Sequence, residues 1–454
     1  MKSLGRKHLA QPPIAACCFL ALALVAGMAI AQVTSVVIDY SKPFEKLSGY
    51  TYVEATMHGT IERDDGSVGE YSVPLVLIYP EDGGNGVGVV DIPNTVFHSA
   101  TGFIPDPDGT LQITRQTTDG FLFEQGYTYA SVQWDKDVTE LFADDPEAAE
   151  QNHLASGSIE QTTDAWHIIR DAAGFLRDPS ALEAVYNPQP VGVDTVLSSA
   201  YSQSGNLLQA FVLQGENEVN GDFAYDGHVI GGGGFGCLAA INDEPAEGDE
   251  VTPRWTGVPC DADAVPPADG SKVIAIITEA TAGFSGVPRF AEEPTNWRQY
   301  ELAGIAHTNP AITPDGPTIL SENRNPVVHV PVFRAAFHNL TQWASEGTPA
   351  PPSKLLEGEI DPETGGFVPD FDEHGHALGG LRLPHMEQEV EGESREPRSA
   401  PTPLLIRSSW RPSSSRRQWI RLLPYLPLSP APSLPSATKC WQSATQTTNP
   451  TWTG

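Results

Sequence analysis

The sequence predicts an α/β fold in which a mostly parallel sheet is covered by helices on both faces. From about residue 126 to residue 303, short apolar segments of strand length alternate with helical patterns. Residues 50–92 contain strand patterns with no helix between them, which predicts antiparallel strands that lead into the parallel part. In the middle, a strand pattern passes directly into a helical pattern at Tyr201–Gly205.

The elements follow one another in a regular order. The antiparallel strands are expected in residues 50–62, Val73–Tyr79 and Val87–Ile92, and a further strand in residues 126–133. Thr162–Leu176 has one apolar face and predicts a helix. The later strands are expected at Thr195–Ala200, Phe223–Ile230, Lys272–Thr278 and Arg298–Ala303. Residues 136–160 and 238–270 are acidic and aperiodic, and we expect them to be surface insertions at the rim of the site.

The N-terminus has the pattern of a secretory signal peptide. Lys2, Arg6 and Lys7 precede an apolar run over Ile14–Ile30, and Ala29-Ile30-Ala31 is an A-x-A cleavage site. The run is short for a transmembrane anchor, which is the alternative interpretation. We therefore expect cleavage after Ala31, a secreted or periplasmic protein, and no membrane span in the mature chain.

The C-terminal residues differ sharply in composition from the rest. Residues 395–454 contain eight Lys or Arg, one acid and ten prolines. The whole chain has a net charge of −32; residues 1–31 contribute +3 and residues 395–454 contribute +7, which leaves −42 for residues 32–394. The sequence therefore predicts a signal peptide (1–31), one α/β domain (32–394) and a basic, Pro/Ser-rich disordered tail (395–454).

Charge and cysteine content restrict the partners. A strongly acidic, Lys-poor domain is not expected to bind nucleic acid. After export, Cys237 and Cys260 remain in the domain and could form a disulfide in an oxidising compartment. Their spacing does not match a metal site, and we expect no cofactor. The sequence does not indicate an oligomeric state.

The turn at Tyr201–Gly205 has the features of a nucleophile elbow, the tight strand-to-helix turn of α/β-hydrolases. Such a turn lifts a serine hydroxyl above the sheet and requires small residues two positions away on each side. Ser202 has Ala200 and Ser204 at those positions, although glycines are usual. Ser204 would have Asn206 there, which fits less well. We therefore expect Ser202 to be the nucleophile.

A serine nucleophile needs a base and an acid that orients it, and in this fold they follow in the order acid, then histidine. His307 follows the expected strand Arg298–Ala303 and is the expected base, whereas His338 falls in a helical pattern. Glu279 ends the expected strand Lys272–Thr278 and is the expected acid. The alternative acids are Glu292 and Glu293, which resemble the start of a helix.

The expected oxyanion hole uses backbone N–H groups, one from Gln203 and one from the Asn94–Thr95 region. Two other motifs are not expected to bind ligands. Gly231–Gly234 is not followed by Gly-Lys-Ser/Thr, so it predicts a close-packed turn rather than a phosphate loop. The acid- and His-rich residues 372–376 predict a solvated loop rather than a metal site.

Several short motifs in this order resemble the secreted "alpha/beta hydrolase domain" family. They include Ser202-Gln-Ser-Gly205, Thr278-Glu279, Tyr300-Glu-Leu-Ala-Gly-Ile-Ala-His307, Gly347-Thr-Pro-Ala-Pro-Pro352 and Gly379-Gly-Leu-Arg-Leu-Pro384. The resemblance covers residues 40–390 and implies an α/β-hydrolase fold with hydrolase chemistry. The sequence departs from the family at Ala200, where glycine is usual, and at Thr281, where relatives tend to have Asp.

Taken together, these patterns predict an exported serine hydrolase that cleaves small-molecule carboxylic esters with a Ser202–Glu279–His307 triad. Two alternatives remain. One is a catalytically inactive binding protein on the same fold, because of the changes at Ala200 and Thr281. The other is a peptidase or amidase. The sequence does not determine the acyl or alcohol specificity.

Overall fold

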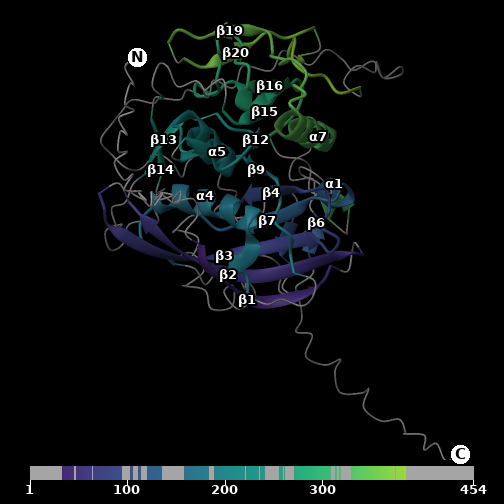
Figure 1. Ribbon diagram of the computed structural model, residues 1–454. Helices are drawn as coiled ribbons and strands as arrows, with labels where there is room; N and C mark the ends of the chain where they lie inside the picture. The colour runs from purple at the N-terminus through teal and green to yellow at the C-terminus, as the bar shows by residue number, and fades with distance from the viewer. Residues whose placement is uncertain are drawn as a thin grey trace, which may run out of the picture. The chain divides into compact units, whose positions relative to one another are not determined.

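The computed structural model (Figure 1) describes residues 33–44, 48–63, 65–94, 103–105, 111–113, 120–134, 158–183, 189–219, 221–234, 236–240, 255–258, 260, 270–307, 312–313, 316–317, 329–363, 365–373 and 375–384. The chain divides into two units, Met1–Gly392 and Glu393–Gly454, and every described residue belongs to the first. The expected signal peptide, the expected tail and Thr95 lie outside the described residues.

One large mixed sheet organises the described chain (Figure 1). Its strands run in the order β1-β2-β3-β7-β4-β9-β12-β15-β16, with β8 paired to β3. Their bounds are β1 Val33–Pro43, β2 Tyr50–Glu62, β3 Val68–Pro80, β4 Val87–Ile92, β7 Thr128–Val132, β8 Ser158–Ile159, β9 Thr195–Tyr201, β12 Gly227–Gly231, β15 Lys272–Thr278 and β16 Trp297–Leu302. The pairs β1–β2, β2–β3 and β3–β7 are antiparallel, and every pair from β7–β4 to β15–β16 is parallel. The predicted α/β-hydrolase fold, with antiparallel N-terminal strands and a mostly parallel sheet, is confirmed. The expectation that Val87–Ile92 is one of the antiparallel strands was wrong: β4 pairs in parallel with both β7 and β9, because β7 is inserted between β3 and β4 in the sheet.

Helices cover both faces of this sheet. One buried cluster joins it to α4 (Asp164–Arg177) and α5 (Gln203–Leu213), and the other joins it to α1 (Phe121–Glu124) and α7 (Val330–Glu346). Alternate residues of a strand enter different clusters: in β9, Val196 and Ala200 face α4 and α5, whereas Leu197 and Tyr201 face α7. The central parallel strands are buried on both faces for this reason, and their sequences are nearly continuous apolar runs.

Later residues of the chain cover part of the outer edge of the last strand, β16. Tyr300 and Leu302 form parallel bridges with Lys354 and Leu381. The backbone also exchanges hydrogen bonds there, including Glu301 N–H to the Lys354 carbonyl at 2.8 Å and Leu381 N–H to the Glu301 carbonyl at 2.7 Å. Residues 351–384 therefore protect the strand that leads to His307, and this explains why the domain continues well beyond that residue.

The smaller elements form separate pairs. They are β5 Phe103–Pro105 with β6 Leu111–Ile113, β10 Glu218–Val219 with β11 Asp222–Phe223, β13 Cys237–Ala240 with β14 Trp255–Val258, β17 Ile312–Thr313 with β18 Gly316–Pro317, and β19 Gly358–Ile360 with β20 Phe367–Pro369. The short helices are α6 (Glu279–Ala282) and the 3₁₀ turn Pro179–Ala181. The β13–β14 hairpin lies within residues 238–270, so part of this expected aperiodic insertion is ordered as strands.

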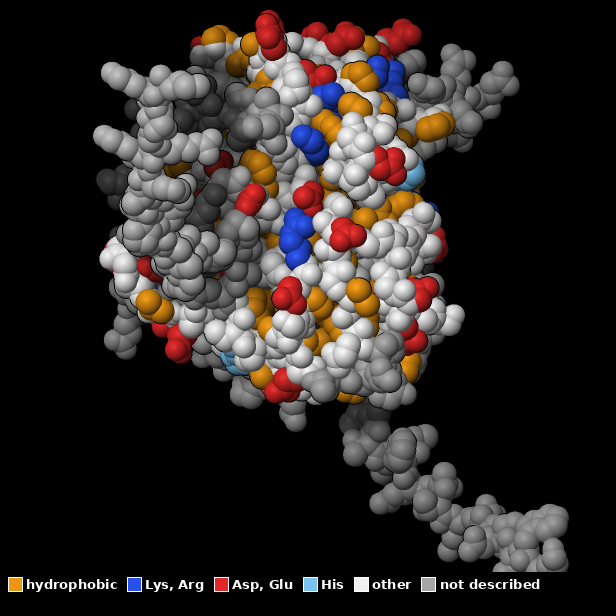
Figure 2. Space-filling model, viewed as in Figure 1, with side chains coloured by type: hydrophobic (Ala, Val, Ile, Leu, Met, Phe, Trp, Pro, Cys, Tyr) orange, Lys and Arg blue, Asp and Glu red, His pale blue; other side chains and the backbone are white. Residues whose placement is uncertain are grey.

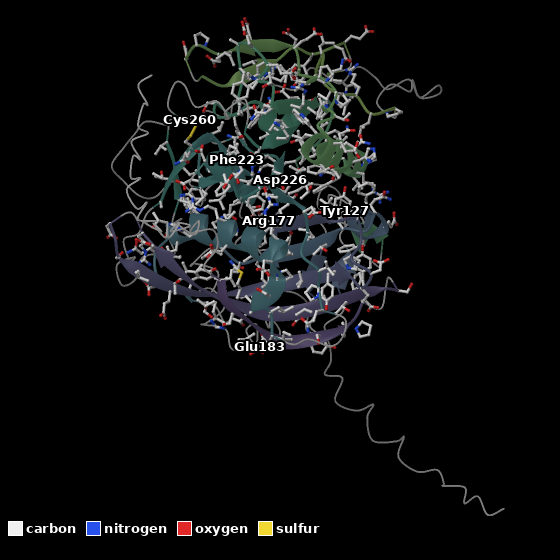
Figure 3. All side chains as sticks on the ribbon, in the orientation of Figure 1. Tyr127, Arg177, Glu183, Phe223, Asp226 and Cys260 are labelled. Carbon is white, nitrogen blue, oxygen red and sulfur yellow. A yellow bond between two sulfur atoms is a disulfide. The ribbon has the colours of Figure 1, made fainter. Side chains whose placement is uncertain are left out.

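Ion pairs fix α4 against the sheet. Arg63, at the end of β2, donates two hydrogen bonds to the fully buried carboxylate of Asp164 at 2.8 Å each. At the other end of α4, Arg177 binds Asp226 at 2.8 Å (Figure 3). A bidentate arginine–carboxylate pair fixes both distance and orientation, so these contacts set how α4 lies on the sheet.

The described helices include none that is both long and apolar enough to cross a membrane. On the face shown in Figure 2, acidic side chains are spread singly among uncharged and apolar ones, and Lys and Arg are fewer.

Candidate active site

Ser202 stands at the corner between β9 and α5 in a strained backbone conformation. Its φ and ψ are 62° and −117°, and among the described residues it is the only non-glycine with positive φ. An L-residue holds such a conformation only when the surrounding structure imposes it, and this strain is found mostly at functional sites. The sharp strand-to-helix turn expected from the sequence is therefore present at the expected residue.

Contacts of three neighbouring residues, Ser202, Ser204 and Gly205, hold this conformation. The Ser202 N–H donates to the Gly231 carbonyl at 2.9 Å. The Ser204 hydroxyl donates to the Tyr201 carbonyl at 3.0 Å and lies 3.2 Å from the Tyr201 N–H. A Cβ on Gly205 would lie 2.3 Å from the Gly231 carbonyl oxygen, so only glycine permits this approach of α5 to β12. Ser204 is fully buried and engaged in the turn, which distinguishes it from the partly exposed Ser202.

Asn94 fixes the loop after β4 to the same turn. Its side-chain carbonyl accepts a hydrogen bond from the Ser204 N–H at 2.9 Å. The first N–H groups of a helix have no acceptor within the helix, so this contact satisfies one of them. The expectation for Asn94 concerned its backbone N–H, and the structure adds a role for its side chain that the sequence analysis missed.

His307 lies directly against Ser202. The Ser202 Oγ and the His307 Nε2 are 2.7 Å apart, across 105 residues of sequence. Burial lowers the pKa of His307 below its usual value, because the charged imidazolium loses solvation there. Its Nδ1 is buried and has no hydrogen-bond partner within the described part of the chain.

Glu279, the expected acid, contacts the loop that carries His307 rather than the His307 ring. It begins α6 at the end of β15, and its Oε2 accepts a hydrogen bond from the Gly304 N–H at 2.6 Å. Gly304 precedes His307 by three residues. Thr281, at the position where relatives tend to have Asp, is buried and donates to the Thr278 carbonyl at 3.1 Å.

The expected oxyanion donors are only partly described. Gln203 is the first residue of α5, so its N–H is at the N-terminal end of a helix, where donors and the helix dipole favour negative charge. Asn94 ends the described part of its loop, and Thr95 is outside the described residues.

The residues weighed against Glu279 and His307 make contacts away from Ser202. Glu292 and Glu293 do not start a helix, so that expectation was wrong; Glu293 accepts a hydrogen bond from the Ser353 N–H at 2.8 Å and lies 3.6 Å from Arg298. His338 is exposed on α7. Asp372 binds Arg382 at 2.9 Å, and the described residues contain no group of three His, Cys, Asp or Glu side chains that could hold a metal ion.

The glycine-rich turn after β12 is joined to both the elbow and a disulfide. The Asn206 side chain accepts from the Gly234 N–H at 2.7 Å, and the Gln209 amide donates to the Gly236 carbonyl at 3.5 Å. Cys237 and Cys260 form a disulfide beside Gly236 (Figure 3). The turn thus acts as packing for the elbow helix, as the sequence analysis expected.

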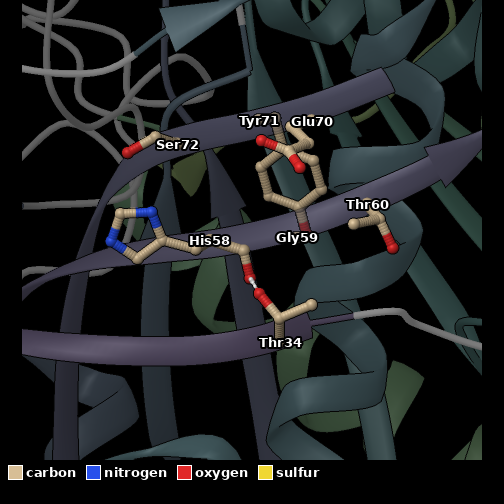
Figure 4. Close-up of a pocket in the computed structure, with 7 residues that line it drawn as sticks. All are labelled: Thr34, His58, Gly59, Thr60, Glu70, Tyr71 and Ser72. Carbon is tan, nitrogen blue, oxygen red and sulfur yellow. Dashed lines mark hydrogen bonds between the residues drawn. The ribbon is translucent and has the colours of Figure 1, made fainter. Parts of the chain in front are cut away.

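A cavity of about 270 Å³ lies elsewhere, on the β1–β2–β3 strands (Figure 4). Its lining residues are Thr34, His58, Gly59, Thr60, Glu70, Tyr71 and Ser72. None of them belongs to the strands that carry Ser202, Glu279 or His307, so this cavity is not part of the candidate active site.

The family model for the alpha/beta hydrolase domain matches residues 55–402, which is more than half of the chain. The chain belongs to this family. The match includes the elbow, the strand that ends at Glu279 and the loop that carries His307. No curated protein matches the sequence.

Solved structures with a similar fold include several esterases. They are the rice cell wall degrading esterase LipA from Xanthomonas oryzae (12% identity, 46% of this chain, 51% of that chain, TM-score 0.27), a putative acetyl xylan esterase from Bacteroides fragilis (11%, 54%, 63%, 0.29) and a glucuronoyl esterase from Solibacter usitatus (12%, 64%, 72%, 0.29). The alignment spans about half the length of the Xanthomonas esterase. At these values the likeness carries no argument about activity, which has to come from the site itself.

Proposed function

We propose that this protein is an exported serine hydrolase that cleaves carboxylic esters through an acyl-enzyme. One observation carries the proposal: Ser202 has the strained elbow conformation, and its Oγ lies 2.7 Å from His307 Nε2. A serine hydroxyl becomes a good nucleophile when a neutral imidazole is placed to accept its proton. The site therefore has a nucleophile and a base in reacting geometry.

In the proposed reaction, Ser202 Oγ attacks the ester carbonyl carbon while His307 Nε2 takes the hydroxyl proton. The carbonyl oxygen becomes an oxyanion, which the Gln203 N–H and a donor from the Asn94–Thr95 region stabilise. The C–O bond to the alcohol breaks, and His307 returns the proton to the leaving oxygen. Water then attacks the acyl-enzyme by the same steps and releases the acid. The lowered pKa keeps His307 neutral, and so able to accept a proton, at neutral pH.

Glu279 is proposed as the third member of the triad. Its negative charge would favour the imidazolium that forms in the transition state, and its hydrogen bond to the Gly304 N–H holds the loop that carries His307. In free enzymes, catalytic hydrogen bonds are often long and tighten when substrate binds, so the observed contact is compatible with this role.

The proposal is tested by the turnover of short-chain, long-chain and aromatic esters, together with labelling by a fluorophosphonate. The mature protein should hydrolyse at least one class of ester and should be labelled at Ser202. Ser202→Ala should abolish labelling and lower kcat/KM by about 10⁴-fold or more, whereas Ser204→Ala should still be labelled. Labelling that persists in Ser202→Ala would refute the assignment.

The same experiments separate the alternatives. A folded protein that is neither labelled nor active would support the inactive binding protein. Cleavage of peptide or amide substrates in preference to esters would support a peptidase or amidase.

A further inference from the structure

We propose that Tyr201 is the positioning residue for the general base. In this proposal, which rests on the proposed function, Tyr201 holds the imidazole of His307 over Ser202 through ring stacking and a hydrogen bond to the His307 backbone. In the sequence, Tyr201 only marks the start of the turn Tyr201–Gly205, and no role for its side chain follows from the pattern.

Two contacts connect the residues. The Tyr201 hydroxyl donates a hydrogen bond to the backbone carbonyl of His307 itself. The Tyr201 ring also stacks against the imidazole, with ring centroids 5.3 Å apart and an angle of 25° between the planes. An offset stack at this separation is favourable and restricts the tilt of the imidazole. One side chain therefore restrains both the backbone and the ring of His307.

Tyr201 is itself held rigidly. It is 6% exposed, stacks against His329 with centroids 5.5 Å apart, and meets the edge of Phe333 at 5.8 Å. A Cβ on Gly231 would lie 2.4 Å from the Tyr201 ring, so glycine at that position makes room for it. Because Tyr201 is also bonded to Ser202 in the chain, it couples nucleophile and base through one rigid group.

The other restraints on His307 do not fix its ring. Glu279 acts on Gly304, three residues earlier in the loop. In the described part of the chain, Nδ1 has no hydrogen-bond partner that would set the rotation of the imidazole. Gly232 lies beside the ring, where an added Cβ would come within 2.9 Å of Cε1, but a glycine offers no polar side chain. The described side chains that restrain His307 are thus Tyr201 and Ser202.

Burial raises the pKa of the Tyr201 phenol well above 10, because the phenolate would lose its solvation. The hydroxyl therefore remains a donor to the His307 carbonyl throughout the pH range in which an esterase is assayed. The protonation state of Tyr201 therefore does not change across a pH profile of the enzyme.

The experiment compares Tyr201→Phe and Tyr201→Leu with the wild-type mature chain. Tyr201→Phe removes the hydrogen bond and keeps the stack, and kcat should fall about tenfold with KM within about twofold. Tyr201→Leu removes both, and kcat should fall about 100-fold, because small misplacements of a base are costly. Histidine-labelled NMR supplies a readout that does not require turnover. The His307 pKa should lie below its usual value in the wild type and stay low in Tyr201→Phe, which keeps the ring buried. It should move back toward its usual value in Tyr201→Leu, because the smaller side chain no longer covers the imidazole.

The matched control is Tyr225→Phe. The Tyr225 hydroxyl is also buried and donates to a backbone carbonyl, that of Ile169. This variant should lose stability but keep the wild-type kcat and the wild-type His307 titration. If Tyr201→Phe keeps the wild-type kcat and Tyr201→Leu keeps the wild-type His307 titration, or if Tyr225→Phe loses kcat to the same degree, Tyr201 is not a positioning residue. A wild-type protein without labelling or turnover contradicts the proposed function instead, and the titration then decides the role of Tyr201.

Discussion

Glu279 and His307 differ in how directly the structure connects them to Ser202, the proposed nucleophile. His307 Nε2 touches the Ser202 hydroxyl, whereas the Glu279 carboxylate touches the backbone of the His307 loop. The Glu279 carboxylate can assist the proposed reaction through its negative charge, or through the hydrogen bond that holds the loop of His307. The two contributions can be separated because glutamine keeps an acceptor oxygen and loses the charge.

We therefore predict that Glu279→Gln keeps its hydrogen bond to Gly304 and remains folded, but loses kcat by several orders of magnitude. A triad acid stabilises the imidazolium in the transition state, and an amide does not. Steady-state kinetics and thermal unfolding measure the two properties. Glu292→Gln serves as the control, with unchanged kcat expected. Full activity in Glu279→Gln would show that the carboxylate only holds the loop.

At the scale of single elements, β16 depends on a buried charge. Glu301 is fully buried; it pairs with Arg289 at 3.0 Å and accepts hydrogen bonds from the Gln299 amide and the Leu356 N–H at 2.8 Å each. The guanidinium of Arg289 also lies 3.5 Å from the centroid of the Phe367 ring. These contacts fasten residues 351–384 to the last strand of the sheet, next to the loop that carries His307.

Glu301→Gln should lower the free energy of unfolding by about 3 kcal/mol, because it removes the charge of the fully buried partner and leaves the partly buried Arg289 without a counter-charge. Chemical denaturation measures this loss. The matched control is Glu293→Gln. Glu293 has 38% of its side chain exposed and lies 3.6 Å from Arg298, so its loss should cost less than about 1 kcal/mol. Equal losses in the two variants would contradict a structural role for the buried pair.

At the scale of the whole molecule, a buried histidine in the central sheet couples stability to pH. His228 in β12 is fully buried between the hydroxyls of Ser198 and Ser271, at 2.7 and 2.9 Å from its two ring nitrogens. Burial lowers its pKa to about 3, because a charged ring there would be desolvated. Both of its ring nitrogens are engaged by serine hydroxyls inside the sheet, and we interpret it as a structural residue.

The sign of this coupling follows from proton uptake. Below about pH 6.5 the unfolded chain binds a proton at His228 that the folded chain does not bind, so stability falls as pH decreases from about 6.5 toward 3. The slope from this group is about 1.4 kcal/mol per pH unit. Urea unfolding between pH 5 and 7 should show it. His228→Gln cannot take up the proton and should have a shallower dependence; an equal slope would contradict the assignment.

The order of elements and the place of the site could be predicted from the sequence because they depend on local patterns. Thr195–Ala200 is a short apolar run beside a helical stripe, so the corner at Ser202 is visible without a structure. Lys272–Thr278 has the same bounds in the structure as in the prediction. The expected helix start at Glu292–Glu293 was wrong, because acids followed by Pro294 also occur in a bend that the Ser353 and Arg298 contacts hold.

The sequence by itself determined that the chain forms an α/β-hydrolase fold with Ser202 at its elbow, since periodicity and turn chemistry involve residues close in the chain. Only the tertiary structure decided which groups meet at that elbow. Tyr201 reaches the carbonyl of His307 across 106 residues, and Ser204 reaches Asn94 across 110. Such contacts depend on the order of strands in the sheet and on the packing between its layers. No pattern of neighbouring residues encodes a hydrogen bond between distant loops, so the sequence indicated the candidate nucleophile and the structure showed which groups contact the candidate base.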